Sequence, residues 1–481
     1  MALGRAPRKG ASGDLGRADC RRARDRRASP PVHLRSLLTS RTGRMAAFFC
    51  LYLTEGIPQG FTATAIATQM RRGGLGPVEI GAFVGSLYLP WAFKWAAGPF
   101  VDVLWSDRLG RRRGWILGTQ LAMVATLLLA IPIDFVSQLS LFTAIIFVHN
   151  LFAATQDVAI DALAVDVLPE HERGMANGFM FGGAYLGMAL GGSGVLFLVP
   201  WIGMAPAYVV VAGAILSVTV FIVLPLQEAK GPPRASMGGQ LIRAVTMELG
   251  AFAKGAVRAF VGSRAALVGV VFALLPAGAM ALGLALQSNL AVELGLDDQQ
   301  VGWLALWSSL IAGVCCVAGG WLSDRFGRRL TLAWTLAAAS LPTAALGYLM
   351  WTHQWITPVA VDAPGRSVPP AALVSAYWVA VLTYNMFQGL FYGIRSAIFM
   401  DVTSRRAAAT QFTAYMALGN LAVSYSATWQ GFTIERWGYP VTLGLDAVLG
   451  VVCLACLPFM AAPRAQERAP VGAAVPEGLP P

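Results

Sequence analysis

Residues 320–329 read GWLSDRFGRR, and a related pattern stands much earlier, where residues 98–102 read GPFVD and residues 107–113 read DRLGRRR. In both copies an aspartate follows a glycine by four residues, and a second glycine then precedes a block of arginines. Each copy comes at the end of a long apolar stretch. The recurrence of one pattern at the same kind of position indicates that the chain has two related halves.

The apolar stretches themselves predict a membrane protein. Of the 481 residues, 56% are hydrophobic and 13% are charged, whereas soluble domains carry roughly 25% charged residues. A soluble enzyme of this size is therefore excluded, and one membrane crossing needs about 20 apolar residues. The stretches long enough to cross are residues 45–69, 78–104, 114–133, 139–166, 173–198, 203–226, 266–292, 299–322, 330–351, 372–400, 408–434 and 440–461.

These twelve stretches predict an all-α polytopic membrane protein with twelve transmembrane helices in two six-helix bundles. We expect the bundles to comprise residues 45–226 and 265–461, joined by a polar connector at residues 227–264. Residues 1–44 and 462–481 are expected to be disordered tails.

The net charge of +11 is concentrated at one end of the chain. Residues 1–44 hold 12 basic and 3 acidic side chains, so the rest of the chain is only +2. We interpret this segment as a solvated cytoplasmic tail, or as an upstream stretch included before a true start at Met45. Binding of RNA or anionic lipid by the tail is the alternative, and nucleic acid is not expected as a partner.

Outside this tail, the loop arginines and lysines divide 18 to 4 between the two predicted sides. Because cytoplasmic loops retain positive charge, we expect both termini in the cytoplasm.

The glycine, aspartate and arginine pattern resembles the loop signature of the major facilitator superfamily. A carboxylate at a helix end can accept hydrogen bonds from a neighbouring helix N-terminus and from arginine. Such contacts can lock one of two alternating conformations, although the arginines alone could simply enforce topology. The residues expected in these gating loops are Gly98, Asp102, Asp107, Arg108, Arg111, Arg112, Gly320, Asp324, Arg325, Gly327, Arg328, Arg329, Asp166, Arg173 and Asp401.

Three further stretches resemble the branch of AmpG-like muropeptide permeases and acetyl-CoA transporters. They are YLTEGIPQG at residues 52–60, ATQDVAID at residues 154–161 and DVLPEHERG at residues 166–174. The resemblance implies proton-driven import of an anionic solute across a bacterial inner membrane. It leaves the substrate open among a cell-wall muropeptide, acetyl-CoA and a siderophore-like cargo.

Three of the carboxylates inside predicted membrane crossings are the main candidates for function, because a charge is costly there. Glu55 lies in the first stretch beside Gly56 and Pro58, which can break a helix. Asp157 and Asp161 are four residues apart and share one helical face. Two carboxylates that close in a low dielectric favour uptake of a proton. We therefore predict that these three acids carry the coupled protons.

Two basic residues inside the stretches are the counter-charges expected for these acids or for an anionic substrate. Neighbouring amides and a tyrosine are expected to line the same cavity. The predicted substrate-binding residues are Lys94, Arg395, Gln156, Asn150, Asn385, Gln388 and Tyr392. The alternative is a buried ion-pair network of Lys94, Asp157 and Asp161 that fixes helix register without touching substrate.

Other chemistry is not supported by the sequence. Glycines 183, 187, 191 and 192 are spaced for close helix packing. No nucleotide-binding loop of the Walker type is present, and no cofactor, metal site or enzymatic nucleophile is expected. We predict a monomer whose partners are a small-molecule substrate, protons and membrane lipid. A non-transporting membrane sensor with the same fold is the rival interpretation.

Overall fold

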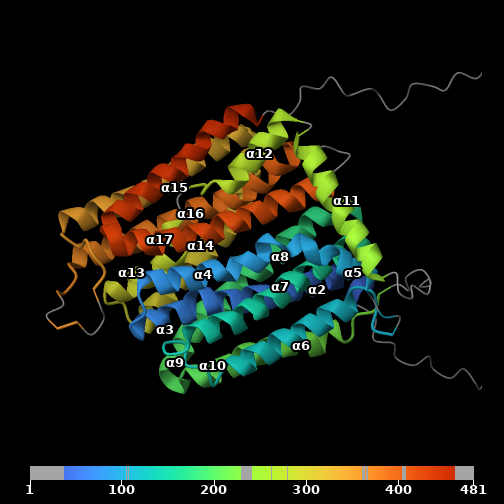
Figure 1. Ribbon diagram of the computed structural model, residues 1–481, viewed down its shortest axis with the longest axis horizontal. Helices are drawn as coiled ribbons and strands as arrows, with labels where there is room; N and C mark the ends of the chain where they lie inside the picture. The colour runs from blue at the N-terminus through green and yellow to red at the C-terminus, as the bar shows by residue number, and fades with distance from the viewer. Residues whose placement is uncertain are drawn as a thin grey trace, which may run out of the picture.

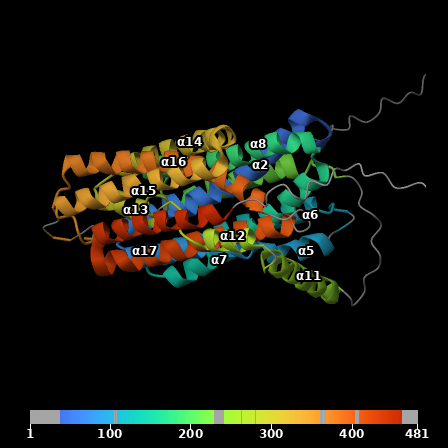
Figure 2. The same ribbon diagram turned by 90° about the horizontal axis from the view of Figure 1, so that it is seen from above.

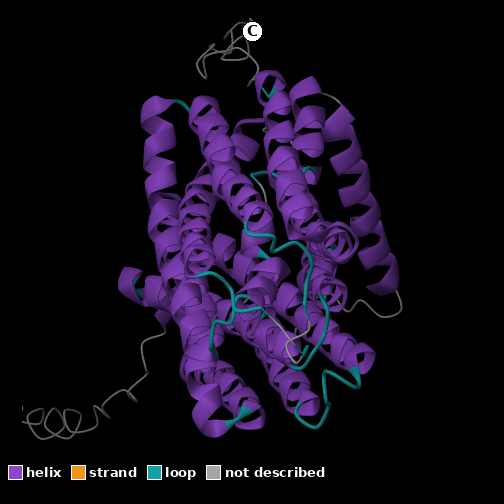
Figure 3. Ribbon diagram, turned by 90° about the vertical axis from the view of Figure 1, so that its left-hand side faces the viewer, coloured by secondary structure: helices purple, strands orange, loops and turns teal. Residues whose placement is uncertain are grey.

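The computed structural model describes residues 37–104, 106, 108–228, 241–261, 263–278, 280–359, 363–364, 367–402 and 408–460. Within them the secondary structure is helical, apart from one isolated bridge between Ser106 and Gly110. Figure 1 shows an elongated bundle, with the first half of the chain in blue and green and the second half in yellow to red. The helices run side by side along its length (Figures 2 and 3).

The first half, residues 37–228, contains six helical runs that coincide with the first six predicted stretches. The chain begins helix α2 at Arg41, four residues before the predicted boundary, because the Ser40 side chain accepts a hydrogen bond from the Gly43 amide. The runs are α2 (Arg41–Gly60) with η2 (Phe61–Ile66) and α3 (Ala67–Arg72); α4 (Pro77–Ala92) with η3 (Lys94–Ala97) and α5 (Gly98–Val103); α6 (Arg113–Ala130); α7 (Leu139–Val167); α8 (Glu170–Ala189) with η4 (Leu190–Gly194) and α9 (Val195–Ile202); and α10 (Met204–Val218) with η5 (Thr219–Val223).

The second half, residues 263–460, follows a helix in the polar connector, α11 (Leu241–Val261), which was not predicted from the sequence. Its elements are α12 (Arg264–Leu274), η6 (Ala281–Gly283), α13 (Ala285–Glu293), α14 (Asp298–Phe326), α15 (Arg328–Thr352), α16 (Ala371–Val402), α17 (Ala408–Val452) and η8 (Cys453–Phe459). Gly438, with a φ of 81°, divides α17 into two helices. Of the predicted tails, residues 1–36 and 462–481 lie outside the described residues. The prediction of a disordered tail is wrong for residues 37–44, which hold the short helix η1 (Leu37–Thr39) and the capped start of α2.

Seven helical segments in the described parts of the chain are long and apolar enough to cross a membrane. They are Arg113–Ala130, Leu139–Val167, Met175–Ile202, Met204–Val223, Asp298–Ser323, Arg328–Thr352 and Gln411–Phe459. The predicted stretches outside this set are interrupted or carry polar residues. The helix of the second stretch ends at Ala92, that of the seventh breaks after Leu274, and the first and tenth hold Glu55 and Arg395.

Helices α2 and α8 pack so closely that glycine is required between them. Ideal Cβ atoms at Gly183, Gly187 and Gly191 would collide with backbone oxygens of α2, the last with the Ile57 oxygen. The predicted packing role of this glycine series is thus confirmed. Glycines also permit close packing between the two halves, since Gly81 on α4 and Gly431 on α17 let these two helices approach each other.

This packing makes Gly191→Ala strongly destabilising. The added methyl group has no space beside the backbone of α2, and overpacking of this kind costs about 1–3 kcal/mol. Gly213→Ala on α10 is the matched control, because a Cβ there meets nothing within 4 Å. We expect thermal unfolding in detergent at a clearly lower temperature for Gly191→Ala only. Equal melting of the two variants would contradict the packing assignment.

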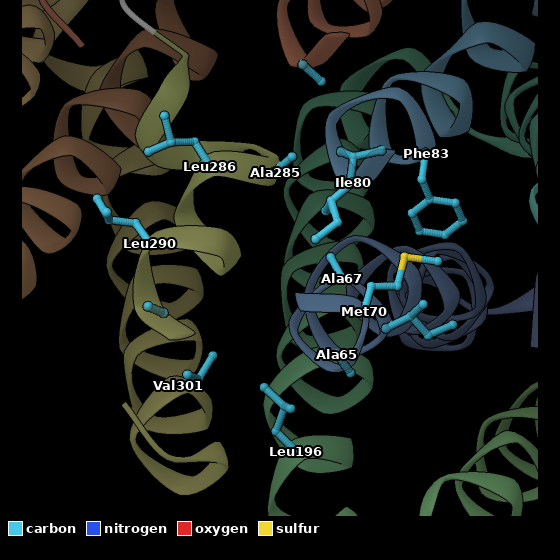
Figure 4. Close-up of a cluster of buried hydrophobic side chains, with 14 of the residues drawn as sticks. Ala65, Ala67, Met70, Ile80, Phe83, Leu196, Ala285, Leu286, Leu290 and Val301 are labelled. Carbon is cyan, nitrogen blue, oxygen red and sulfur yellow. The ribbon is translucent and has the colours of Figure 1, made fainter. Parts of the chain in front are cut away.

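The apolar core is shared by the two halves at one end of the bundle and is divided between them at the other end. One large cluster contains residues of both halves, and Figure 4 shows part of it, with Met70 and Ile80 from the first half and Leu290 and Val301 from the second. Two smaller clusters each belong to one half, residues 45–226 and residues 265–460. We call the end that carries the shared cluster and α3 the Arg71 end, and the opposite end, where α6 begins, the Arg112 end.

Candidate functional site

The structure brings together the predicted acidic residues and Lys94. Lys94 forms a salt bridge with Asp157, and both side chains are largely buried. The Tyr52 hydroxyl donates a hydrogen bond to Asp161 Oδ1 at 2.6 Å. Glu55 is 6% exposed and lies within electrostatic range of Asp157, Asp161 and Lys94. We call Glu55, Lys94, Asp157 and Asp161 the acid–lysine cluster.

Local structure explains why these four residues meet. Helix α4 ends at Ala92, where Phe93 leaves helical geometry, and Lys94 begins the short turn η3 that faces α7. The spacing of Asp157 and Asp161 places both on one face of α7. The expected break at Gly56 and Pro58 is not found, because α2 continues to Gly60. The helix instead widens to a π-helical segment from Phe61 to Ile66, a distortion frequent at functional sites.

The predicted amides occupy different environments. Gln156 is fully buried and donates a hydrogen bond to Thr54 Oγ1 at 2.9 Å, so it faces the interior of the first half. Asn150 bonds to the Ile146 oxygen at 3.0 Å, and Asn385 bonds to the Val381 oxygen at 2.9 Å, each within its own helix. Gln388 Oε1 is buried and has no hydrogen-bond partner among the described residues.

Arg395 is a buried cation on α16. It is 7% exposed, and no acidic side chain in the described residues forms a salt bridge with it. Its guanidinium carbon lies 4.5 Å from the centre of the Tyr392 ring, and its Nε has no partner in the described part of the chain. Gly419 on α17 provides room, since a Cβ there would lie 3.3 Å from Arg395 Nη1. An unpaired buried charge is costly, so this site favours an anion.

At the Arg112 end, the first predicted gating loop forms an ion cluster. Arg112 Nη1 lies 2.7 Å from Asp102 Oδ1, and its Nε lies 3.1 Å from Asp166 Oδ2. Arg111 lies 3.3 Å from the same Asp102 oxygen. Gly98 begins α5 and Gly110 has a φ of 92°, while Arg108 is exposed. All these ion pairs lie within the first half.

The second copy of the pattern forms the junction of α14 and α15. Gly320 lies within α14, and Gly327, with a φ of 89°, separates the two helices. The guanidinium carbon of Arg325 lies 5.7 Å from the Trp321 ring centre. Arg328 begins α15, and Arg329 is exposed. Asp107 lies outside the described residues, as do the side chains of Arg173, Asp324 and Asp401.

Sequence reasoning missed two acids at the Arg112 end. Glu228 accepts hydrogen bonds from the backbone amides of Arg111, Arg112 and Arg113, at the N-terminus of α6. Glu172 forms a bidentate pair with Arg44, at 2.7 Å. The signal for Glu228 was its place directly after the sixth stretch, because unpaired amides at a helix N-terminus attract a carboxylate.

The chain is similar to known transporters in sequence and in fold. The family profile described as Major Facilitator Superfamily matches residues 45–427 and 268–479. The anhydromuropeptide permease of Escherichia coli strain K12 is 26% identical over 403 residues, which are 82% of this chain and 75% of the permease.

Solved structures with the same fold include two sugar transporters. The D-xylose–proton symporter matches with a TM-score of 0.66 and 10% identity, over 87% of this chain and 97% of the symporter. The xylose transporter XylE from Escherichia coli matches with a TM-score of 0.64 and 13% identity, over 89% and 98% of the two chains. At such identities the likeness concerns the fold alone.

Proposed function

The chain belongs to the Major Facilitator Superfamily, and from that premise we propose that it imports an anionic cell-wall muropeptide by proton-coupled alternating access. Membership makes it a multi-pass integral membrane protein and a transporter, not an enzyme. The distant similarity to the anhydromuropeptide permease supports the choice of substrate. Acetyl-CoA and siderophore-type cargo are the competing solutes for the test below.

We further propose that the polypeptide crosses the membrane twelve times, in bundles at residues 45–226 and 265–461. The agreement between the helical runs and the twelve apolar stretches supports this count. The excess of arginine and lysine in loops at the Arg112 end supports a cytoplasmic position for that end and for both termini, in a bacterial inner membrane. The Arg71 end then faces outward.

Arg395 is the observation that carries the proposal of an anionic substrate. Lys94 is paired with Asp157, whereas Arg395 is buried without a described acidic partner. An anionic group of the substrate would supply the missing charge, and Tyr392 would hold the guanidinium in place. The acid–lysine cluster would then carry the proton, since its three carboxylates share one lysine in a low-dielectric environment.

Competition uptake in proteoliposomes tests this function. Labelled anhydromuropeptide is supplied outside vesicles with an alkaline interior, and unlabelled muropeptide, acetyl-CoA or a ferric siderophore is added at two external pH values. We expect only the muropeptide to compete and uptake to rise at the lower external pH. Absence of labelled uptake, or stronger competition by acetyl-CoA or the siderophore than by the muropeptide, would contradict the proposed substrate. Accumulation that a protonophore does not reduce would contradict proton coupling. Removal of residues 1–36 should leave uptake intact, unlike the output of a tail-dependent sensor.

A further inference from the structure

Two ion pairs join the two halves of the chain at the Arg71 end. Arg71 forms a salt bridge with Glu293, and their side chains are 3% and 0% exposed. The adjacent Arg72 lies 2.6 Å from Asp298, whose other oxygen accepts a hydrogen bond from Gln69 at 2.9 Å. The basic and amide groups all come from α3, and the acids come from α13 and α14. We call Gln69, Arg71, Arg72, Glu293 and Asp298 the outer cluster.

Backbone groups of the second half complete this contact. Arg71 donates a hydrogen bond to the Val359 oxygen at 2.9 Å, and the Val359 amide donates one to Glu293 Oε1 at 2.6 Å. Arg72 donates a hydrogen bond to the Leu296 oxygen at 2.8 Å. The arginines therefore bind the loops after α13 and α15 as well as the two acids. Separation of the halves would break every bond that the arginines make, while the bond between Val359 and Glu293 lies within the second half.

The position of the two arginines needs an explanation. Arg71 and Arg72 are two of only four basic residues in the loops predicted to face outward. A buried ion pair adds little stability compared with apolar packing, because desolvation offsets the attraction between the charges. Here the ions lie beside an apolar cluster built by both halves, which includes Met70 and Leu290 (Figure 4). Such an arrangement suits a contact that must form and break.

The Arg112 end lacks an equivalent contact between the halves in the described residues. The salt bridges between described side chains at this end, Arg44 with Glu172 and Arg112 with Asp102 and Asp166, lie within the first half. Its apolar side chains form two separate clusters, one in each half. The salt bridges that join the halves and the apolar cluster that both halves share thus coincide at the Arg71 end.

We propose that the outer cluster is the external gate of the transporter, closed here, and that Arg71 and Arg72 are positioning residues that stabilise the inward-facing state. This inference rests on the proposed alternating access. To admit substrate from outside, the protein must part Arg71 from Glu293 and Arg72 from Asp298, and water then solvates the four charges. Loss of Arg71 leaves the buried Glu293 without its counter-charge and favours the open gate.

Distance measurement between two spin labels tests the gate without any substrate. Cysteines at Ser137 and His353, both exposed at the Arg71 end and in different halves, carry the labels in a chain whose native cysteines are replaced. We expect one short distance in the parent. Arg71→Gln should raise the fraction of molecules with a longer distance at least fivefold, and Arg71→Lys should restore much of the short distance. Arg71→Gln combined with Glu293→Gln should lengthen the distance in fewer molecules than Arg71→Gln alone, because the second change removes the buried acid that the first leaves unpaired.

Arg44→Gln is the matched control, since it breaks a largely buried arginine–glutamate pair within one half. It should leave the distance unchanged. An unchanged distance in Arg71→Gln, or an equal shift in Arg44→Gln, would overturn the gate. Because the measurement needs no substrate, a working gate in a chain that fails to take up muropeptide would contradict only the proposed substrate. Normal uptake with no shift would contradict only the gate.

Discussion

We expect the variant Glu55→Gln to lose all accumulation of muropeptide against its concentration gradient. In Glu55→Gln proteoliposomes with an inward proton gradient, we expect muropeptide uptake no higher than in liposomes without protein. Glu55 is a buried carboxylate beside Asp157 and Asp161, whereas the side-chain amide of glutamine cannot take up and release a proton. Exchange of labelled for unlabelled substrate at equal concentrations should continue, because that process moves no net proton.

This contrast separates proton coupling from a purely structural ion network. Glu55→Gln leaves the salt bridge of Lys94 and Asp157 in place, whereas Asp157→Asn leaves a buried lysine unpaired and can disturb folding. Asp134→Asn is the control: this exposed loop residue accepts hydrogen bonds from the Ser137 hydroxyl and from the amides of Val136 and Ser137, which lower its pKa. It should accumulate substrate normally. Uphill uptake by Glu55→Gln would refute its proton-carrying role.

Arg395→Gln should weaken muropeptide binding by about 10- to 100-fold, since a hydrogen bond to a charged group contributes about 1.5–3 kcal/mol. The same change should leave the thermal stability of the substrate-free protein equal or higher, because it removes a buried cation without a described acidic partner. Calorimetric titration and thermal unfolding in detergent measure the two effects. A residue needed only for folding would give the opposite pattern.

Two further variants make this result specific. Arg395→Lys keeps the charge but loses the planar guanidinium above Tyr392, so binding should be intermediate. Arg436→Gln removes an exposed arginine of the second half and should bind as tightly as the parent. Parental affinity in Arg395→Gln would rule out Arg395 as the site of the anionic group.

Much of the helical architecture follows from hydropathy because each apolar stretch must satisfy its own backbone hydrogen bonds in lipid. The pairing of Lys94 with the acids could also be anticipated, since few other charges are available within the predicted crossings. Side-chain direction was harder to predict. Apolar residues occur on every face of α7, so periodicity could not reveal that Gln156 faces Thr54.

Contacts between distant parts of the chain were beyond sequence reasoning. Arg71 and Glu293 are 222 residues apart, and Arg111 and Glu228 are 117 apart. Each partner looks like an ordinary loop charge when viewed alone. In the sequence, Arg71 is one of the few basic residues on the predicted outer side. Its buried contact with Glu293 becomes visible only when the two halves are placed relative to each other.

The apolar cluster shared by both halves links the conformational equilibrium to temperature. Opening at the Arg71 end would hydrate side chains such as Met70, Ile80, Leu290 and Val301, which are buried in the closed form. Hydration of apolar surface raises heat capacity, and its free-energy cost falls on cooling. The balance between inward-facing and outward-facing forms should therefore follow a curved van't Hoff plot, with the outward-facing form gaining population in the cold.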